Sequence, residues 1–77
     1  MRMLNYVTDQ PLRQVGVLLT RDEAEALLER LQAILKAGRG YARLEDADWG
    51  DLDITLWSPE TLPFLHHRAR RLIETGE

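Results

Sequence analysis

The sequence predicts an α+β fold with the element order ββαββα, in which a four-stranded, mainly antiparallel sheet carries two helices on one face. Two strand-like stretches precede a strongly amphipathic helix, two more surround an acidic turn, and a second amphipathic stretch lies near the end of the chain. A helix with one apolar stripe buries it against another layer, so these elements form a two-layer sandwich. With 77 residues, we expect a single domain over residues 1–77.

The composition narrows the class of protein. An apolar share of 44%, a charged share of 30% and a net charge of −3 are typical of a folded, soluble domain and disfavour nucleic acid as a partner. The chain has no cysteine, which excludes disulfides and thiolate metal sites and fits the cytoplasm. No apolar run approaches the roughly 20 residues of a membrane span, and no signal peptide is expected at the N-terminus.

The first predicted hairpin joins strands at residues 3–8 and 12–19. Between them, the tripeptide Asp9-Gln10-Pro11 is typical of a turn, because proline fixes φ and donates no hydrogen bond. The second strand places Val15, Val17 and Leu19 on one face.

The first helix is predicted at residues 21–37. Thr20 and Glu23 form a capping box at its start, and Gly38 is the expected residue just past its end. An apolar stripe runs along it with a spacing of three to four residues. The stripe consists of Ala24, Leu27, Leu28, Leu31, Ile34 and Leu35.

A second hairpin is predicted from strands at residues 40–45 and 51–57. One face of it is apolar and consists of Ala42, Leu44, Leu52, Ile54 and Leu56. Keeping these residues on one side allows two registers. In one, Arg43 lies opposite Asp53 and Tyr41 opposite Thr55; in the other, Tyr41 lies opposite Trp57.

The last helix is predicted to begin near Thr61 or Leu62, with Pro63 in its first turn, and to end at Gly76. Its apolar stripe consists of Leu62, Leu65, Ala69, Leu72 and Ile73. Two strand orders, 2-1-3-4 and 1-2-3-4, remain open for the sheet.

The clearest candidate for a functional surface is the acidic turn of the second hairpin. Residues 45–60 hold six acids and no base, and Trp49 stands among them. Carboxylates steer a basic partner, and an exposed tryptophan is a typical interface anchor. The predicted partner-binding residues are Asp46, Asp48, Trp49, Asp51, Asp53, Tyr41, Arg43 and Trp57. Two other interpretations stay open: a turn that only keeps the protein soluble, and aromatic pairs that only stabilise the sheet.

Other chemistry has less support. The acidic turn resembles the start of a calcium loop, but Asp51 replaces the required glycine and Trp57 the bidentate glutamate, so we expect no metal and no cofactor. His66 and His67 point about 100° apart on a helix and cannot chelate one ion together. A histidine paired with a carboxylate of the acidic turn would be the basis for a small enzyme. Residues 66–71 are basic, which is typical of a solvated helix face.

Residues 20–31 (TRDEAEALLERL) and 62–73 (LPFLHHRARRLI) resemble the helices of small bacterial immunity proteins of polymorphic-toxin systems. Members of such families bind and block a cognate toxin, often with an acidic surface placed over a basic active site. The resemblance implies a non-enzymatic inhibitor that binds a basic protein through the acidic turn. The alternatives are a homo-oligomeric accessory subunit that pairs through the uncovered sheet face, and the small enzyme.

Overall fold

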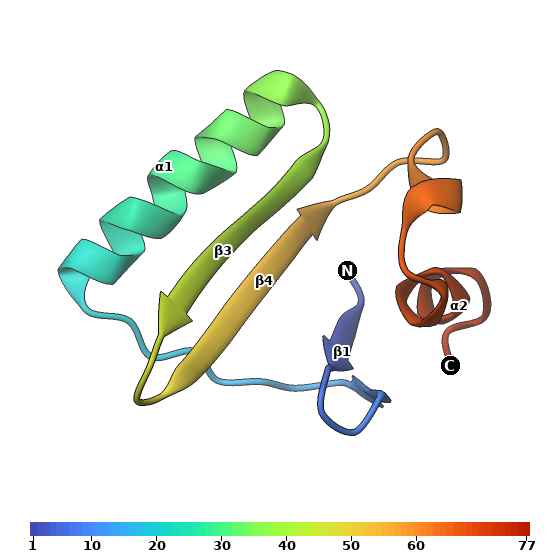
Figure 1. Cartoon of the computed structure of the whole chain (residues 1–77), viewed down its shortest axis with the longest axis horizontal. Coiled ribbons are helices and arrows are strands. Elements are labelled where there is room, and N and C mark those ends of the chain that lie inside the picture. Colours follow the sequence, from blue (N-terminus) through green and yellow to red (C-terminus); the bar gives the residue numbers. More distant parts are fainter. The chain divides into compact units, whose positions relative to one another are not determined.

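The computed structural model describes residues 1–77 and shows an α+β chain with two α-helices and two two-stranded antiparallel sheets (Figure 1). The chain divides into two compact units. One comprises Leu18–Ser58; the other comprises Met1–Val17 together with Pro59–Glu77. Neither helix is long and apolar enough to cross a membrane. The expectation of one domain over residues 1–77 stays a prediction.

The first helix, α1 (Arg21–Ala37), is confirmed at its predicted bounds. The hydroxyl of Thr20 accepts a hydrogen bond from the main-chain N–H of Glu23 at 3.2 Å. In return, the carboxylate of Glu23 accepts one from the N–H of Thr20 at 2.9 Å. The helix ends at Gly38, whose φ of 77° lies in the left-handed region that glycine tolerates. The local capping signals therefore account for both ends of α1.

The second hairpin consists of β3 (Gly40–Asp46) and β4 (Gly50–Leu56), within one residue of the predicted bounds at each end. Its register places Arg43 opposite Asp53 and Tyr41 opposite Thr55, which is the first of the two predicted pairings. This register keeps the apolar residues of both strands on one face.

α1 packs against this apolar face, mainly on β3. Ala42 is buried there, and a side chain at Gly40 would approach Ile34 of α1 to 3.6 Å. The predicted apolar stripe of α1 is only partly covered, because Leu28 remains 57% exposed and Leu35 67% exposed. The hairpin thus covers one edge of the stripe and leaves the other edge bare.

The first hairpin is shorter than predicted. It pairs β1 (Met3–Asn5) with β2 (Gln10–Leu12), and its turn falls at residues 6–9, not at residues 9–11. The side chain of Asn5 accepts hydrogen bonds from two main-chain N–H groups of the turn. Asp9 then adopts a left-handed φ of 57°, which aspartate tolerates better than most residues. These side-chain interactions turn the chain earlier than the alternating pattern suggests.

The predicted strand at residues 12–19 does not form, and the four-stranded sheet is not present. Beyond Leu12 the chain has no regular structure until α1, and Val15 and Val17 are exposed. β1 and β2 make one two-stranded sheet, and β3 and β4 make another. With only three residues in each strand of the first hairpin, there is no long edge on which a larger sheet could be built.

The last helix is also interrupted. In place of the predicted helix start near Thr61 or Leu62, a single 3₁₀ turn, η1 (Leu62–Phe64), forms around Pro63. Leu65 is then extended, and α2 (His67–Thr75) begins only at His67. α2 ends at Gly76 in the left-handed region, which confirms the predicted end. Leu72 of its apolar stripe is buried. The Nε of Arg68 donates a hydrogen bond to the main-chain oxygen of Asp9 at 2.7 Å, so α2 is joined to the first hairpin.

Candidate binding surface

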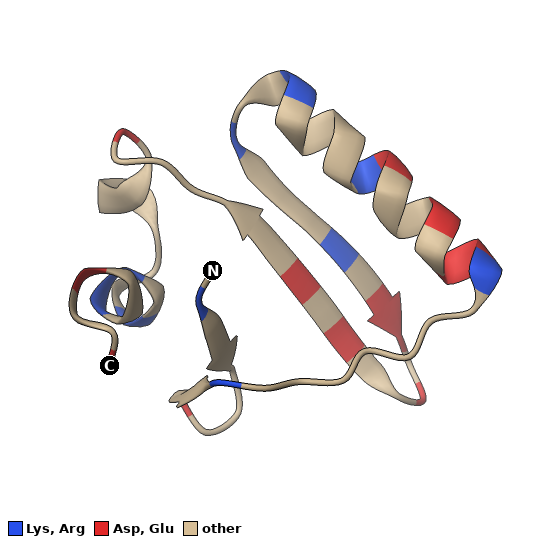
Figure 2. Cartoon of the chain, turned by 180° about the vertical axis from the view of Figure 1, so that it is seen from behind, with Lys and Arg blue, Asp and Glu red and all other residues tan.

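The predicted partner-binding residues all lie on, or directly after, the second hairpin. Because side chains alternate along a strand, the face opposite α1 is formed by residues of odd number. We call this the helix-free face; its strand residues are Tyr41, Arg43, Glu45, Asp51, Asp53 and Thr55. Trp57 directly follows β4 and is also of odd number. Figure 2 shows acidic residues on β4 and at the end of β3, with a basic residue earlier on β3.

A bidentate ion pair between Arg43 and Asp53 crosses the helix-free face. The Nε of Arg43 donates to one carboxylate oxygen of Asp53 at 2.6 Å, and a terminal nitrogen donates to the other at 2.7 Å. The Asp53 side chain is only 12% exposed. These hydrogen bonds from Arg43 lower the pKa of Asp53, and the same contacts raise the pKa of Arg43 further above its usual range. Asp53 is therefore an ionised carboxylate whose partner is already present within the hairpin.

The tip of the hairpin has a different arrangement. One carboxylate oxygen of Asp46 accepts hydrogen bonds from the main-chain N–H groups of Asp48 and Trp49, at 2.9 and 3.2 Å. This Asx turn is an ordinary local role for aspartate. The Trp49 side chain is 90% exposed, between Asp48 and Asp51, which are exposed as well. The tip thus presents a large apolar ring beside two carboxylates that have no role in holding the turn.

Aromatic side chains extend this surface along the helix-free face. Tyr41 is 66% exposed, and the guanidinium carbon of Arg43 lies 5.9 Å from the centre of its ring. Trp57 is 41% exposed. Tyrosine, tryptophan and arginine are the residue types enriched where protein interfaces draw most of their affinity. Of the eight predicted residues, Asp46, Arg43 and Asp53 make hydrogen bonds within the hairpin. The side chains of the other five are exposed: Tyr41, Asp48, Trp49, Asp51 and Trp57.

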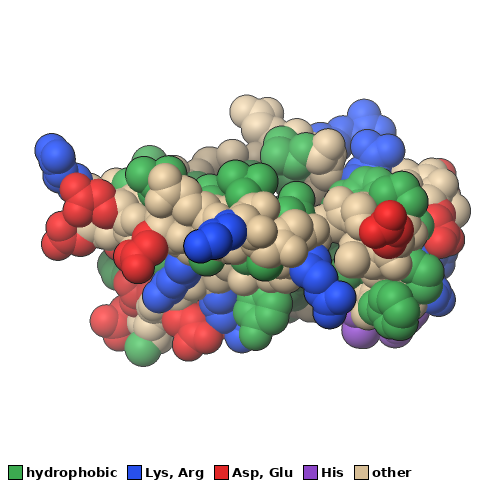
Figure 3. Space-filling view, turned by 90° about the horizontal axis from the view of Figure 1, so that it is seen from above, with side chains coloured by type: hydrophobic (Ala, Val, Ile, Leu, Met, Phe, Trp, Pro, Cys, Tyr) green, Lys and Arg blue, Asp and Glu red, His purple; other side chains and the backbone are tan.

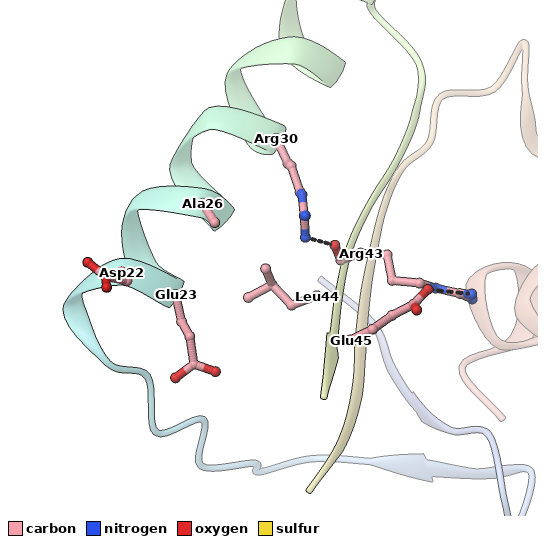
Figure 4. Close-up of a pocket in the computed structure, with 7 residues that line it drawn as sticks. All are labelled: Asp22, Glu23, Ala26, Arg30, Arg43, Leu44 and Glu45. Carbon is pink, nitrogen blue, oxygen red and sulfur yellow. Dashed lines mark hydrogen bonds and ion pairs between the residues drawn. The ribbon is translucent and has the colours of Figure 1, made fainter. Parts of the chain in front are cut away.

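A shallow pocket of about 520 Å³ lies between the start of α1 and β3. Figure 4 shows Leu44 directed toward α1 and the side chains of Arg43 and Glu45 directed away from it. The guanidinium of Arg30 donates to the main-chain oxygen of Arg43, and the carboxylate of Glu23 belongs to the helix cap. Since these polar groups already have partners, the pocket is a shallow hollow between packed elements and offers few free polar groups to a ligand.

Figure 3 shows acidic side chains gathered at the end of this unit where α1 begins.

The two histidines have a structural role that the sequence did not indicate. Nδ1 of His66 accepts a hydrogen bond from the N–H of Arg68 at 3.2 Å and so caps α2. The ring of His67 stacks at a tilt on that of His66, with 4.2 Å between the centroids. A pair of adjacent histidines after a proline gave no capping signal, because histidine is not among the residues that usually occupy this position.

No group of three or more His, Cys, Asp or Glu side chains is arranged to hold a metal ion. Comparison of the chain with protein-family models, curated proteins and solved structures finds no significant match. The functional interpretation therefore depends on the residues of the second hairpin.

Proposed function

We propose that this chain is a non-catalytic binding protein that acts in the cytoplasm and recognises a basic protein through the tip and helix-free face of its second hairpin. The observation that carries the proposal is Trp49, which is almost fully exposed between two carboxylates that the hairpin does not need. A solubilising turn requires charge but no tryptophan, whereas an interface anchor combines a large apolar side chain with polar neighbours.

The charge of the surface supports a basic partner. The strands of the helix-free face carry one arginine and three carboxylates, and Asp46 and Asp48 add further negative charge at the tip. Such a field raises the rate at which a positively charged protein finds the surface. The exposed rings of Trp49 and Tyr41 then supply the apolar area that stabilises the complex.

An immunity or inhibitor role fits this surface best, because an acidic protein that covers a basic active site blocks it without any chemistry of its own. The resemblance of the two helices to small bacterial immunity proteins supports the same role. A homo-oligomeric accessory subunit is the second candidate. The exposed aromatic rings of the helix-free face favour it, but two copies meeting through that face would bring net negative surfaces together.

Affinity capture from lysate of the source cells, followed by titration of the recovered partner with purified variants, tests the proposal. Asp48→Lys and Trp49→Ala should each weaken binding of a stoichiometric basic partner by about tenfold or more. Glu74→Lys is the matched control, because it makes the same charge change on α2. Binding should also weaken as salt rises.

If Asp48→Lys and Trp49→Ala bind the partner as tightly as the unaltered protein, the proposed surface is wrong. A dimer in light scattering that persists in both variants would favour the oligomeric alternative. Turnover of a substrate that depends on His66 or His67 would favour the enzyme.

A further inference from the structure

The sheet of the second hairpin has two outer edges, because β3 and β4 pair only with each other. The edge of β3 lies near α1, and one of its main-chain oxygens, that of Arg43, accepts a hydrogen bond from Arg30 of that helix (Figure 4). α1 packs mainly against β3. A side chain of the protein itself therefore occupies part of the β3 edge, whereas β4 forms the opposite edge of the pair.

The contact of Arg30 also shows which residues direct their main-chain groups outward. Along an antiparallel pair, successive residues point their N–H and C=O groups alternately toward the partner strand and away from it. Since the carbonyl of Arg43 is engaged outside the pair, Arg43 and the opposite residue, Asp53, point outward. The alternation extends to the other odd-numbered residues of β4. The outer edge of β4 is thus formed by the N–H and C=O groups of Asp51, Asp53 and Thr55.

These outward residues are the ones whose side chains lie on the helix-free face. A strand added beside them would direct alternate side chains toward Asp51 and Asp53, and the intervening ones toward the apolar face with Leu52 and Ile54. Lysine or arginine suits the first set, because the side chain of Asp51 is exposed without a partner in the hairpin and cross-strand pairs of opposite charge are stabilising. Apolar residues suit the second set. The edge therefore matches an extended segment in which basic and apolar residues alternate.

We propose that the outer edge of β4 binds an extended basic segment of the partner as a third, antiparallel strand. This inference rests on the proposed function and specifies how its surface would recognise a partner. Strand addition to a sheet edge draws affinity from main-chain hydrogen bonds and specificity from alternate side chains. The exposed ring of Trp49 at the start of β4 would cover one end of the added segment.

A second copy of this chain fits the edge less well. Pairing β4 with another β4 would set aspartates among aspartates on the shared helix-free face, and like charges on neighbouring strands are destabilising. Charged residues on an edge strand commonly deter such self-pairing. The same charges select a basic strand.

A synthetic peptide of alternating lysine and valine, about nine residues long and blocked at both ends, is the probe. In the antiparallel arrangement, the residues directly opposite Asp51 and Asp53 are lysines, and their N–H groups point toward β4. N-methylation of the main-chain amides of the lysine residues should weaken binding at least about tenfold. Their hydrogen bonds to β4 are lost, and the methyl groups clash with the strand edge. N-methylation of the main-chain amides of the valine residues should change the affinity by less than about twofold, because these N–H groups point away from β4.

Amide-resolved hydrogen exchange on the full chain supplies the second measurement. In the free protein the amides of Asp51, Asp53 and Thr55 should exchange faster than those of Leu52 and Ile54, which pair within the hairpin. Adding the peptide should slow the first group selectively. Thr55→Pro should abolish binding without removing a bond of the hairpin, whereas Glu45→Pro on the β3 edge should retain it.

The outcomes separate this inference from the proposed function. If the lysine-methylated peptide binds as well as the parent while Asp48→Lys still weakens both, the surface stands and strand addition is overturned. A peptide that requires unmethylated valine amides would indicate parallel pairing and would overturn the antiparallel proposal. Amides of the β4 edge that are already protected in the free chain, or a dimer in light scattering, would overturn it as well. Insensitivity of every basic probe to Asp48→Lys and Trp49→Ala would count against the proposed function itself.

Discussion

Arg43 and Asp53 face each other across the second hairpin, and Nε and one terminal nitrogen of Arg43 donate hydrogen bonds to the two carboxylate oxygens of Asp53 at 2.6 and 2.7 Å. The pair lies at the middle of the helix-free face, in a register that keeps the apolar residues against α1. The ion pair therefore affects both the stability of the hairpin and the charge that its surface presents. It stabilises the register. Because Glu45 also lies 3.6 Å from a terminal nitrogen of Arg43, the negative charge that is available to a partner is concentrated on Asp48 and Asp51.

The stability of the hairpin should depend on pH through Asp53. Because Arg43 lowers the pKa of Asp53 in the folded state, the unfolded chain binds a proton more readily. The stabilisation is present above the ordinary aspartate pKa of about 3.9 and is lost as pH falls from there through the lowered folded value. Urea unfolding of Asp53→Asn should show a smaller loss of stability over that acid range than the unaltered protein. Equal slopes in the two proteins would contradict this role for Asp53.

The capping box of α1 should be measurable as a stability difference. Thr20→Ala removes the hydroxyl that accepts from Glu23 and should lower the free energy of unfolding by about 1 kcal/mol. Thr20→Ser keeps the hydroxyl and is the matched control, with little expected change. Chemical denaturation followed by circular dichroism would measure both variants. A Thr20→Ser variant as destabilised as Thr20→Ala would show that the hydroxyl is not the stabilising group.

The left-handed residue after α1 offers a test of backbone strain without a steric clash. A Cβ at Gly38 would meet no atom within 4 Å, so only the φ of 77° opposes a side chain. Gly38→Ala should therefore lower the free energy of unfolding by about 1–2 kcal/mol. Gly16 also has open space around its Cβ position but has no positive φ. Gly16→Ala should leave stability unchanged or slightly raised, and an equal loss in both variants would contradict the argument from φ.

The elements that the sequence predicted well are those whose signals are local. Thr20, Glu23 and Gly38 fix α1 within a single turn at each end, and the alternation of β3 and β4 limits their register to two choices. The turn of the first hairpin was mispredicted. Hydrogen bonds to the side chain of Asn5 start the turn at residue 6, three residues before the predicted turn that ends at Pro11. The missing four-stranded sheet follows from that early turn, because the residues after Leu12 were needed for its second strand.

In the candidate surface, too, the features with a local sequence signal were predicted and those that depend on packing between elements were not. Strand alternation by itself predicts that Tyr41, Arg43 and Asp53 share one face, and the ion pair between the last two is confirmed. The contact from Arg30 to the main-chain oxygen of Arg43 could not be foreseen, because it depends on how α1 lies over β3. A contact between a side chain of one element and the main chain of another produces no periodic pattern in the sequence, so it cannot be predicted from such patterns.

Arg68 provides a last test, in the unit that contains α2. Its Nε holds the main-chain oxygen of Asp9, while one of its terminal nitrogens is buried without a partner. Arg68→Ala should speed hydrogen exchange at the amide of Asp9, which donates to Asn5 at 2.8 Å within the turn. Arg71→Ala is the control, because Arg71 is exposed on the same helix and its loss should leave that amide unchanged.

Arg68→Met separates the two roles of the side chain. Methionine keeps an apolar stem but lacks the guanidinium, so it should speed exchange at Asp9 as much as alanine does. It also removes the nitrogen that is buried without a partner, which is a destabilising feature of the native protein. Thermal unfolding should therefore show Arg68→Met to be more stable than Arg68→Ala. If the methionine variant is the less stable of the two, the buried nitrogen has a partner in solution, and its hydrogen bond supports α2.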